Sequence, residues 1–218
     1  MKKKIIIFAQ RDFIFTYKIL NSIVNEFNNY EAYLKLDNSN FFRKIKVILC
    51  MILFSGIKDL KSLFKFEKLS KKFKITNDAA IQNFDFGISL NYPKKISLQS
   101  FNIYNFHLGN LKTQRGSFIF FYKFLHKWDK ISLTLHKITD EFDKGEIIIE
   151  KELDCKNMNS IQILNLYNKN IDFMKKGIDI IKNNNHISYS VTHDKAYKQP
   201  TFYEIIKHRF NVRKNEIK

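Results

Sequence analysis

The sequence predicts an α/β domain with a largely parallel central sheet flanked by helices. Residues 5–9 form a continuous apolar run, which is typical of a strand buried on both faces. Residues 13–27 follow with apolar side chains at helical spacing, and residues 84–90 and 103–106 are two further apolar runs of strand length. A buried strand, a helix and more buried strands in this order indicate Rossmann-like winding.

The remaining elements follow from the same kinds of pattern. We expect one or two helices over residues 41–74, interrupted near Ser55 and Gly56 and ending before Ile75. Residues 131–136 alternate apolar with polar side chains, which predicts a half-buried strand. The other expected elements are a helix over 117–125, a strand over 146–150, a long amphipathic helix over 159–181 and a final helix after Pro200.

Length and cysteine content favour one main domain in a reducing compartment. At 218 residues the chain is long enough to bury a core without disulfides or metals. We expect the main domain over residues 1–182 and a short C-terminal extension over 183–218. Cys50 and Cys155 lie in unrelated contexts without a CxxC motif or a histidine at metal spacing, so neither a disulfide framework nor a zinc site is indicated.

The chain is strongly basic. Its formal net charge of +17 and its isoelectric point near 9.7 favour anionic partners such as nucleotides, nucleic acid or an acidic membrane face. The abundance of Lys, Asn, Ile and Phe also fits the drift of an AT-rich genome, which raises lysine content without building a binding patch. Only five of the 38 basic residues are arginine, the preferred side chain for phosphates and base edges, so dedicated nucleic-acid binding is disfavoured.

The sequence indicates a cytoplasmic protein. The apolar run at residues 5–9 is too short for a secretory signal and is followed by Arg11 and Asp12. The longest apolar run, residues 47–54, falls far short of the roughly 20 residues that span a bilayer. Basic residues on both sides of it leave peripheral contact with an anionic membrane as an alternative, although core helices are the favoured interpretation.

Three polar side chains, which lie in segments that contain glycine, are the main indication of function in the sequence. Asn105 and His107 lie at the end of the strand predicted over residues 103–106, and Asp143 lies in a turn between two later strands. Three of the six glycines fall in these segments, where backbone geometry can require them: Gly109, Gly116 and Gly145. An amide, an imidazole and a carboxylate at strand ends of an open α/β sheet are the groups that an acyl-transfer site uses.

The motifs around these side chains resemble the catalytic core of the folate-dependent formyltransferases. They are Asn-x-His at 105–107 with a loop that ends in Arg-Gly at 115–116, and Thr-x-His at 134–136 with Asp-x-Gly at 143–145. The family includes glycinamide ribonucleotide formyltransferase, the formyltransferase of initiator methionyl-tRNA and the sugar N-formyltransferases of surface polysaccharide pathways. The similarity covers residues 84–150 well and the rest only in element order. It implies the formyltransferase fold, with residues 1–182 as the catalytic domain.

The resemblance assigns the catalytic roles to Asn105, His107 and Asp143, with 10-formyltetrahydrofolate as co-substrate. An amine attacks the formyl carbon, and fixed donors stabilise the negative charge that builds on the formyl oxygen. The Asn105 amide and a protonated His107 are the candidate donors, and His107 can also move the amine's proton to the departing folate nitrogen. Asp143 can hold the imidazole charged and oriented, and no metal is required.

The resemblance also implies where the folate binds. Its pterin would lie against the backbone of two segments, where main-chain groups pair with the ring edge and side-chain identity matters little. The residues of these segments are Leu90, Asn91, Tyr92, Ile138, Thr139, Asp140 and Glu141.

An amino sugar is the expected acceptor. No glycine follows the first strand to cradle a phosphate, which argues against glycinamide ribonucleotide. The tail from Tyr197 through Pro200 to Glu204 is similar to the ending of formyltransferases in cell-surface polysaccharide pathways, although Thr201 and Glu204 also form a simple capping box. A nucleotide-linked sugar carries a diphosphate, which would suit the basic balance. The candidate substrate-binding residues are Arg11, Arg115 and Gly116.

The chain departs from the family at two loop positions, and other functions stay open. Leu108 and Lys112 stand where the family has prolines, so we expect a less rigid loop. A methionyl-tRNA enzyme would carry a further nucleic-acid-binding domain, for which this chain is too short. The alternatives to a nucleotide- or lipid-linked amino sugar are a divergent glycinamide ribonucleotide formyltransferase and a non-catalytic basic protein at a membrane or nucleic acid. A homodimer is also open.

Overall fold

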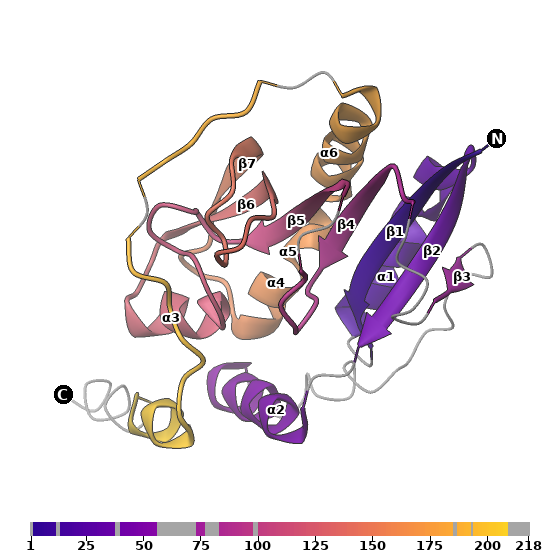
Figure 1. Ribbon diagram of the computed structural model, residues 1–218. Coiled ribbons are helices and arrows are strands. Elements are labelled where there is room, and N and C mark those ends of the chain that lie inside the picture. The colour runs from indigo at the N-terminus through magenta and orange to yellow at the C-terminus, as the bar shows by residue number, and fades with distance from the viewer. Residues whose placement is uncertain are drawn as a thin grey trace.

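A computed structural model of the chain describes residues 2–11, 14–37, 40–55, 73–76, 83–97, 100–184, 187–192 and 194–208. These residues build a seven-stranded sheet with helices packed against it (Figure 1), so the expected α/β class is confirmed. The strands are β1 (Lys3–Gln10), β2 (Tyr30–Asp37), β3 (Lys74–Ile75), β4 (Phe86–Leu90), β5 (Asn102–Leu108), β6 (Lys130–Lys137) and β7 (Ile147–Asp154).

The order of the strands places β5 inside the sheet, between β4 and β6. It runs β3-β2-β1-β4-β5-β6-β7, with parallel pairing from β3 to β5 and antiparallel pairing at β6 and β7. The winding reverses between β1 and β4, and open α/β sheets bind their ligands beyond the carboxyl ends of the strands near such a point. The carboxyl end of β5, next to β4, carries Asn105 and His107.

Strand β1 shows how the sheet is buried on both faces. Ile5, Ile7 and Ala9 pack into the larger core beneath the helices, whereas Ile6 and Phe8 pack into a smaller cluster on the opposite face. All five side chains are at most 2% exposed. The continuous apolar run is therefore explained by alternation between two apolar environments.

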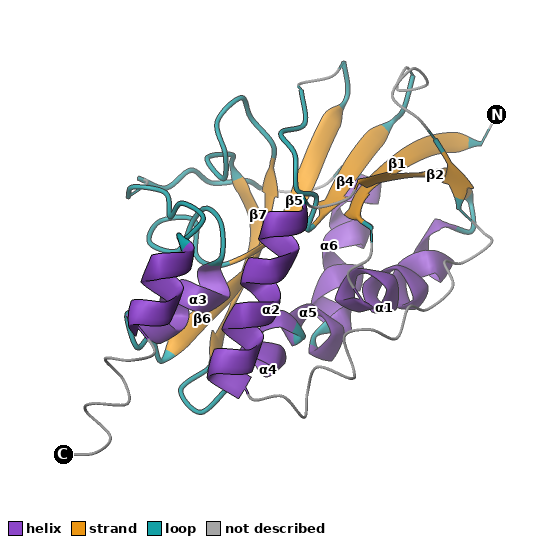
Figure 2. Cartoon of the chain, turned by 90° about the horizontal axis from the view of Figure 1, so that it is seen from below, coloured by secondary structure: helices purple, strands orange, loops and turns teal. Residues whose placement is uncertain are grey.

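The helices gather on one side of the sheet (Figure 2). Those that cover the larger core are α1 (Ile14–Ile23), α4 (Ser160–Leu164), α5 (Leu166–Lys169) and α6 (Ile171–Asn183). Helices α2 (Phe41–Ser55) and α3 (Ile119–Leu125) lie beyond the carboxyl ends of the parallel strands (Figure 1). None of the described helices is long and apolar enough to cross a membrane.

The structure adds β2 and β3, two strands that the sequence patterns did not predict. β2 alternates its burial only partly, because it pairs with the short β3 and lies near the edge of the sheet. The helix predicted over 41–74 is confirmed as far as Ser55, and residues 56–72 lie outside the described part of the chain. At its far end the prediction is wrong, since Lys74 and Ile75 pair with β2 as strand β3.

Two further elements differ from their predictions. The helix expected over 159–181 is interrupted at Asn165 and Asn170, where φ and ψ leave helical values. At Asn170 the side-chain nitrogen donates to the Leu166 oxygen at 2.9 Å and so competes with the helical ladder. Strand β6 was expected to be half-buried but is covered on both faces, because the polar side chains of Thr134 and His136 are themselves buried in the site described below.

The C-terminal segment returns along the molecule and docks against α3. It pairs with Ile147 through Tyr189 and with Gly116 through Tyr197. The Tyr197 ring packs in an aromatic cluster with Tyr122, His126 and Trp128, at centroid distances of 4.3, 5.5 and 5.5 Å. A helix over 202–208 follows, and it begins with the predicted capping box, in which Thr201 and Glu204 bond each other's backbone nitrogen.

Stability depends on the double burial of β1. We expect Ile7→Ala to lower the free energy of unfolding by about 2–5 kcal/mol, because Ile7 is fully buried and the cavity left behind cannot collapse completely. Ile187→Ala is the matched control, since Ile187 is 94% exposed and should change stability by less than about 0.5 kcal/mol. Urea denaturation of both variants measures the difference, and equal losses would contradict this account of the core.

Candidate active site

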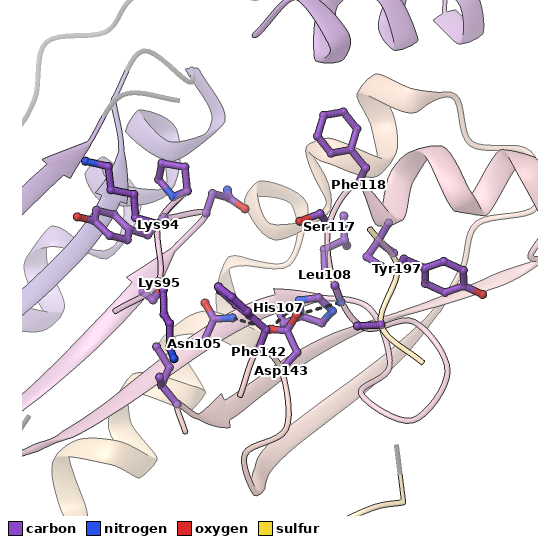
Figure 3. A pocket seen from close by; sticks show the side chains of 18 of the residues that line it. Lys94, Lys95, Asn105, His107, Leu108, Ser117, Phe118, Phe142, Asp143 and Tyr197 are labelled. Carbon is purple, nitrogen blue, oxygen red and sulfur yellow. Dashed lines mark hydrogen bonds and ion pairs between the residues drawn. The ribbon is translucent and has the colours of Figure 1, made fainter. Parts of the chain in front are cut away.

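Asn105, His107 and Asp143 converge at the carboxyl end of β5 (Figure 3). Asn105 and His107 point to the same face of the sheet, because they are two residues apart on one strand. Asp143 reaches them from the β6–β7 turn, where its own backbone is left-handed with φ 51°. The three side chains that were predicted to form one site therefore lie close together in the structure.

The Asp143 carboxylate is the centre of this cluster. Its Oδ1 lies 3.4 Å from Asn105 Nδ2 and 3.6 Å from His107 Nδ1. The same oxygen lies 3.5 Å from His136 Nε2, and its Oδ2 accepts a hydrogen bond from the Gly116 backbone nitrogen at 3.0 Å. One carboxylate therefore holds together β5, β6 and the loop that ends at Gly116.

The surroundings of Asp143 favour its ionised form. Burial alone would raise the pKa of this carboxyl, since the side chain is only 11% exposed. The charge of His107, the hydrogen bond and charge of His136 and the Gly116 N–H oppose that effect and lower the pKa well below its ordinary value. Asp143 is therefore a buried carboxylate that is ionised throughout the physiological range.

The loop after β5 fixes the orientation of His107. His107 Nε2 lies 2.9 Å from the Gln114 backbone oxygen, which can only accept, so Nε2 donates and Nδ1 faces Asp143. The Gln114 side chain in turn donates to the Lys130 oxygen and accepts from the Asn110 backbone nitrogen. Each ring nitrogen of His107 thus faces an oxygen atom, which fixes the orientation of the imidazole.

Polar side chains rigidify this loop in place of the missing prolines. Asn110 Oδ1 accepts from the backbone nitrogens of Lys112 and Thr113, and Asn110 Nδ2 donates to Glu150 at 2.7 Å. Thr134 Oγ1 donates to the Gly109 oxygen at 2.8 Å. The less rigid loop expected from Leu108 and Lys112 is thus compensated by hydrogen bonds.

Glycine is required at the two turns of the loop. Gly109 has φ +142°, and a Cβ there would lie 2.1 Å from the Gln114 oxygen. Gly116 has φ +106°, and a Cβ there would lie 2.3 Å from the Tyr197 oxygen. Both positions combine a left-handed backbone with a close approach that no side chain permits. The clustering of glycines around the site has a physical cause.

The cluster faces a cavity of about 590 Å³. Most of the residues predicted to contact a folate line it, namely Asn91, Tyr92, Ile138, Thr139, Asp140 and Glu141. Leu90 lies beneath the cavity wall and is 2% exposed. Of the predicted substrate-binding residues, Gly116 lines the cavity and Arg11 and Arg115 do not. Arg11 follows β1 at the surface, and its backbone nitrogen bonds Asp37.

Several cavity residues were not predicted from the sequence. They are Arg43 of α2, Lys94 and Lys95 after β4, and Lys195 and Lys198 of the C-terminal segment. These positions come from three separate stretches of a lysine-rich chain, so no local motif marks them. His136 also lines the cavity, and its Nδ1 donates to the Lys137 oxygen at 3.0 Å.

The lowered pKa of Asp143 makes stability depend on pH. An ionised Asp143 contributes stability above its unfolded pKa of about 3.9, and this share is lost as the pH falls towards the lower folded pKa. We therefore expect the difference in unfolding free energy between wild type and Asp143→Asn to shrink between about pH 5 and pH 3. Urea denaturation across this range tests it, with the surface substitution Asp129→Asn as control. A constant difference would contradict the assigned environment.

The sequence matches no model of a known protein family and no curated protein. The structure, in contrast, resembles solved formyltransferases. A 4-N formyltransferase from Francisella tularensis superposes with a TM-score of 0.62 at 19% identity, covering 91% of this chain and 76% of that chain.

Two other solved structures agree with this result. An N-formyltransferase from Helicobacter canadensis, in complex with folinic acid and dTDP-3-aminofucose, gives a TM-score of 0.61 at 16% identity and covers 96% of this chain and 79% of that chain. The methionyl-tRNA formyltransferase from Clostridium thermocellum gives 0.56 at 11% identity, with coverage of 95% and 81%. Across most of its length, the chain has the fold of the formyltransferases, as its motifs implied.

Proposed function

We propose that the protein transfers a formyl group from 10-formyltetrahydrofolate to a primary amine on a nucleotide- or lipid-linked amino sugar. The observation that carries this proposal is the meeting of Asn105, His107 and Asp143 around one carboxylate oxygen at the wall of a cavity. These are the three side chains to which the formyltransferase resemblance assigns catalysis. Their geometry also suits the chemistry on physical grounds.

In the proposed reaction the amine nitrogen attacks the formyl carbon, and the carbonyl electrons move to the oxygen. Asn105 Nδ2 carries two hydrogens, and it lies 3.2 Å from His136 Nε2 and 3.4 Å from Asp143 Oδ1. The contact with Asp143 is long, so the hydrogen on that side can turn to the developing oxyanion. The bond from the formyl carbon to the folate nitrogen then breaks. That nitrogen takes up a proton, and the amine loses one, with His107 as the group that moves it.

Asp143 supports this step without contacting the formyl group. As an ionised carboxylate beside Nδ1, it stabilises the positive charge that His107 holds during proton transfer. The backbone contact from Gln114 keeps the opposite nitrogen of the ring in place. The imidazole is thereby oriented before substrates bind, which lowers the cost of reaching the transition state.

A folate co-substrate is supported by the lining of the cavity. Residues 91–92 and 138–141, the segments expected to pair with a pterin, are among the residues that line it. The Helicobacter canadensis structure was solved with folinic acid, a formylated folate. A nucleotide-linked amino sugar as acceptor is supported by dTDP-3-aminofucose in that same complex and by the basic side chains of this cavity. Surface polysaccharide synthesis is the process that we infer.

Catalysis should depend on the three converging side chains. We expect His107→Asn and Asp143→Ala each to lower the rate of amine formylation at least about 100-fold, because they remove the proton-transfer group and the charge that supports it. The matched control is Asp129→Ala, which makes the same change as Asp143→Ala at an exposed position outside the cavity. Single-turnover formylation of dTDP-linked amino sugars provides the measurement. Wild-type rates in either site variant would refute the assigned roles.

Folate binding should be detectable without knowledge of the acceptor. We expect 5-formyltetrahydrofolate to raise the melting temperature, because a ligand at 100 times its dissociation constant adds about 2.7 kcal/mol to stability. Differential scanning fluorimetry measures this shift. A protein that ignores the folate but binds RNA or anionic vesicles in a salt-dependent manner would instead be the non-catalytic basic protein.

A further inference from the structure

The wall of the cavity contains an arginine that the proposed chemistry does not use. Arg43 lies in the first turn of α2, and its backbone nitrogen bonds the Asn40 side chain at 2.7 Å. It is the only arginine among the described residues that line the cavity. Arg43 therefore adds a positive charge to the cavity that the segments after β5 and β6 also line.

An aromatic ring holds the Arg43 side chain in position. The guanidinium carbon lies 5.5 Å from the centroid of the Phe118 ring. Phe118 is 5% exposed and has a left-handed backbone, with φ 59° and ψ 36°, at the start of α3. Such a conformation is unfavourable for a bulky residue and tends to occur at binding sites. Stacking on a ring also leaves the N–H edge of a guanidinium free to bind an anion.

Among the described residues, no carboxylate balances the charge of Arg43. Within the part of the chain that the structure describes, the guanidinium forms no ion pair with a carboxylate. Burial lowers its pKa, and no acidic neighbour opposes that effect. A partly buried cation without a counter-ion is unfavourable unless a ligand supplies the missing charge. Since no described residue supplies this charge, the position of Arg43 at the cavity is a candidate site for an external anion.

Besides Lys94 and Lys95, two further lysines line the same cavity as Arg43. Lys195 and Lys198 line the cavity from the C-terminal segment, which the bridge between Gly116 and Tyr197 fastens beside the catalytic loop. Lys94 differs from them, because it pairs with Asp37 at 2.6 Å. A multiply charged anion is therefore better matched to this cavity than a single carboxylate.

We propose that Arg43, supported by Lys195 and Lys198, binds the phosphoryl group that joins the amino sugar to its carrier and so determines which amines are accepted. This inference rests on the proposed function, whose acceptor it specifies. It replaces Arg11 and Arg115, which lie outside the cavity, as the arginine that recognises the acceptor. The shared chemistry is a diphosphate, and its carrier is either a nucleoside or a polyprenyl lipid.

The test measures binding first, so that it does not depend on turnover. The full chain is titrated calorimetrically with thymidine diphosphate or uridine diphosphate, which represent a nucleoside carrier. It is titrated separately with farnesyl diphosphate in detergent micelles, which represents a polyprenyl carrier. For the ligand that binds wild type, we expect Arg43→Ala to weaken binding about tenfold to a hundredfold, as loss of a charge-assisted bidentate contact does. Arg43→Lys keeps the positive charge but loses the bidentate guanidinium. Its dissociation constant should therefore lie between those of wild type and Arg43→Ala.

Lys44→Ala is the matched control, because it removes one charge from the same helical turn without altering the cavity lining. It should leave the dissociation constant within about twofold of wild type. Thermal shift with 5-formyltetrahydrofolate, unchanged in Arg43→Ala, shows that the variant is folded and that the folate site is intact.

Kinetics separate failure of this inference from failure of the proposed function. In an active enzyme, Arg43→Ala should raise KM for the diphosphate-linked acceptor while KM for the folate and kcat change less than about twofold. Three results would each overturn the inference. They are equal diphosphate affinity in wild type and Arg43→Ala, an equal loss of affinity in Arg43→Ala and Lys44→Ala, and no diphosphate binding by wild type. Absence of folate binding and formylation, with Arg43-dependent diphosphate binding intact, would instead overturn only the formyl transfer.

Discussion

The site depends on one buried carboxylate that must stay charged. Asp143 is withdrawn from water, and its ionisation is maintained by His107, His136 and the Gly116 N–H acting together. Each of these partners comes from a different segment, so the charge can be stabilised only when β5, β6 and the intervening loop are correctly placed. The residues that keep Asp143 ionised are therefore the same residues that fix the geometry of the cluster.

The loop between β5 and α3 shows how that constraint is met without rigid residues. Asn110 and Gln114 satisfy backbone groups on both sides of the loop, and Gln114 also presents its carbonyl to His107. Buried polar networks of this kind stabilise one conformation when every member has a partner. Hydrogen bonding in this chain thus does what proline does in the resembling family, which keeps His107 oriented despite the sequence difference.

The strands that could be predicted from the sequence are those whose side chains are buried along most of the strand. β1 is apolar on both faces and β4 is buried along its whole length, so the fold class could be predicted. The Asn-x-His and Asp-x-Gly motifs each lie within a few residues of sequence, so the cluster of Asn105, His107 and Asp143 could be predicted as well. β2 was missed because edge burial leaves it without a clear period. Arg43 was missed for a different reason: its side chain is held at the cavity by a tertiary contact with Phe118, 75 positions later in the numbering, and no local pattern encodes such a contact.

The docking of the C-terminal segment affects the order in which the parts of the cavity form during folding. Tyr197 pairs with Gly116, and the aromatic cluster with Tyr122 and Trp128 secures it, yet these partners are far apart along the chain. Closing so long a connection carries an entropic cost that local strand and helix formation does not. We expect the sheet to be assembled before this wall is in place, so that the capacity to recognise a substrate matures later than the compact body that carries it.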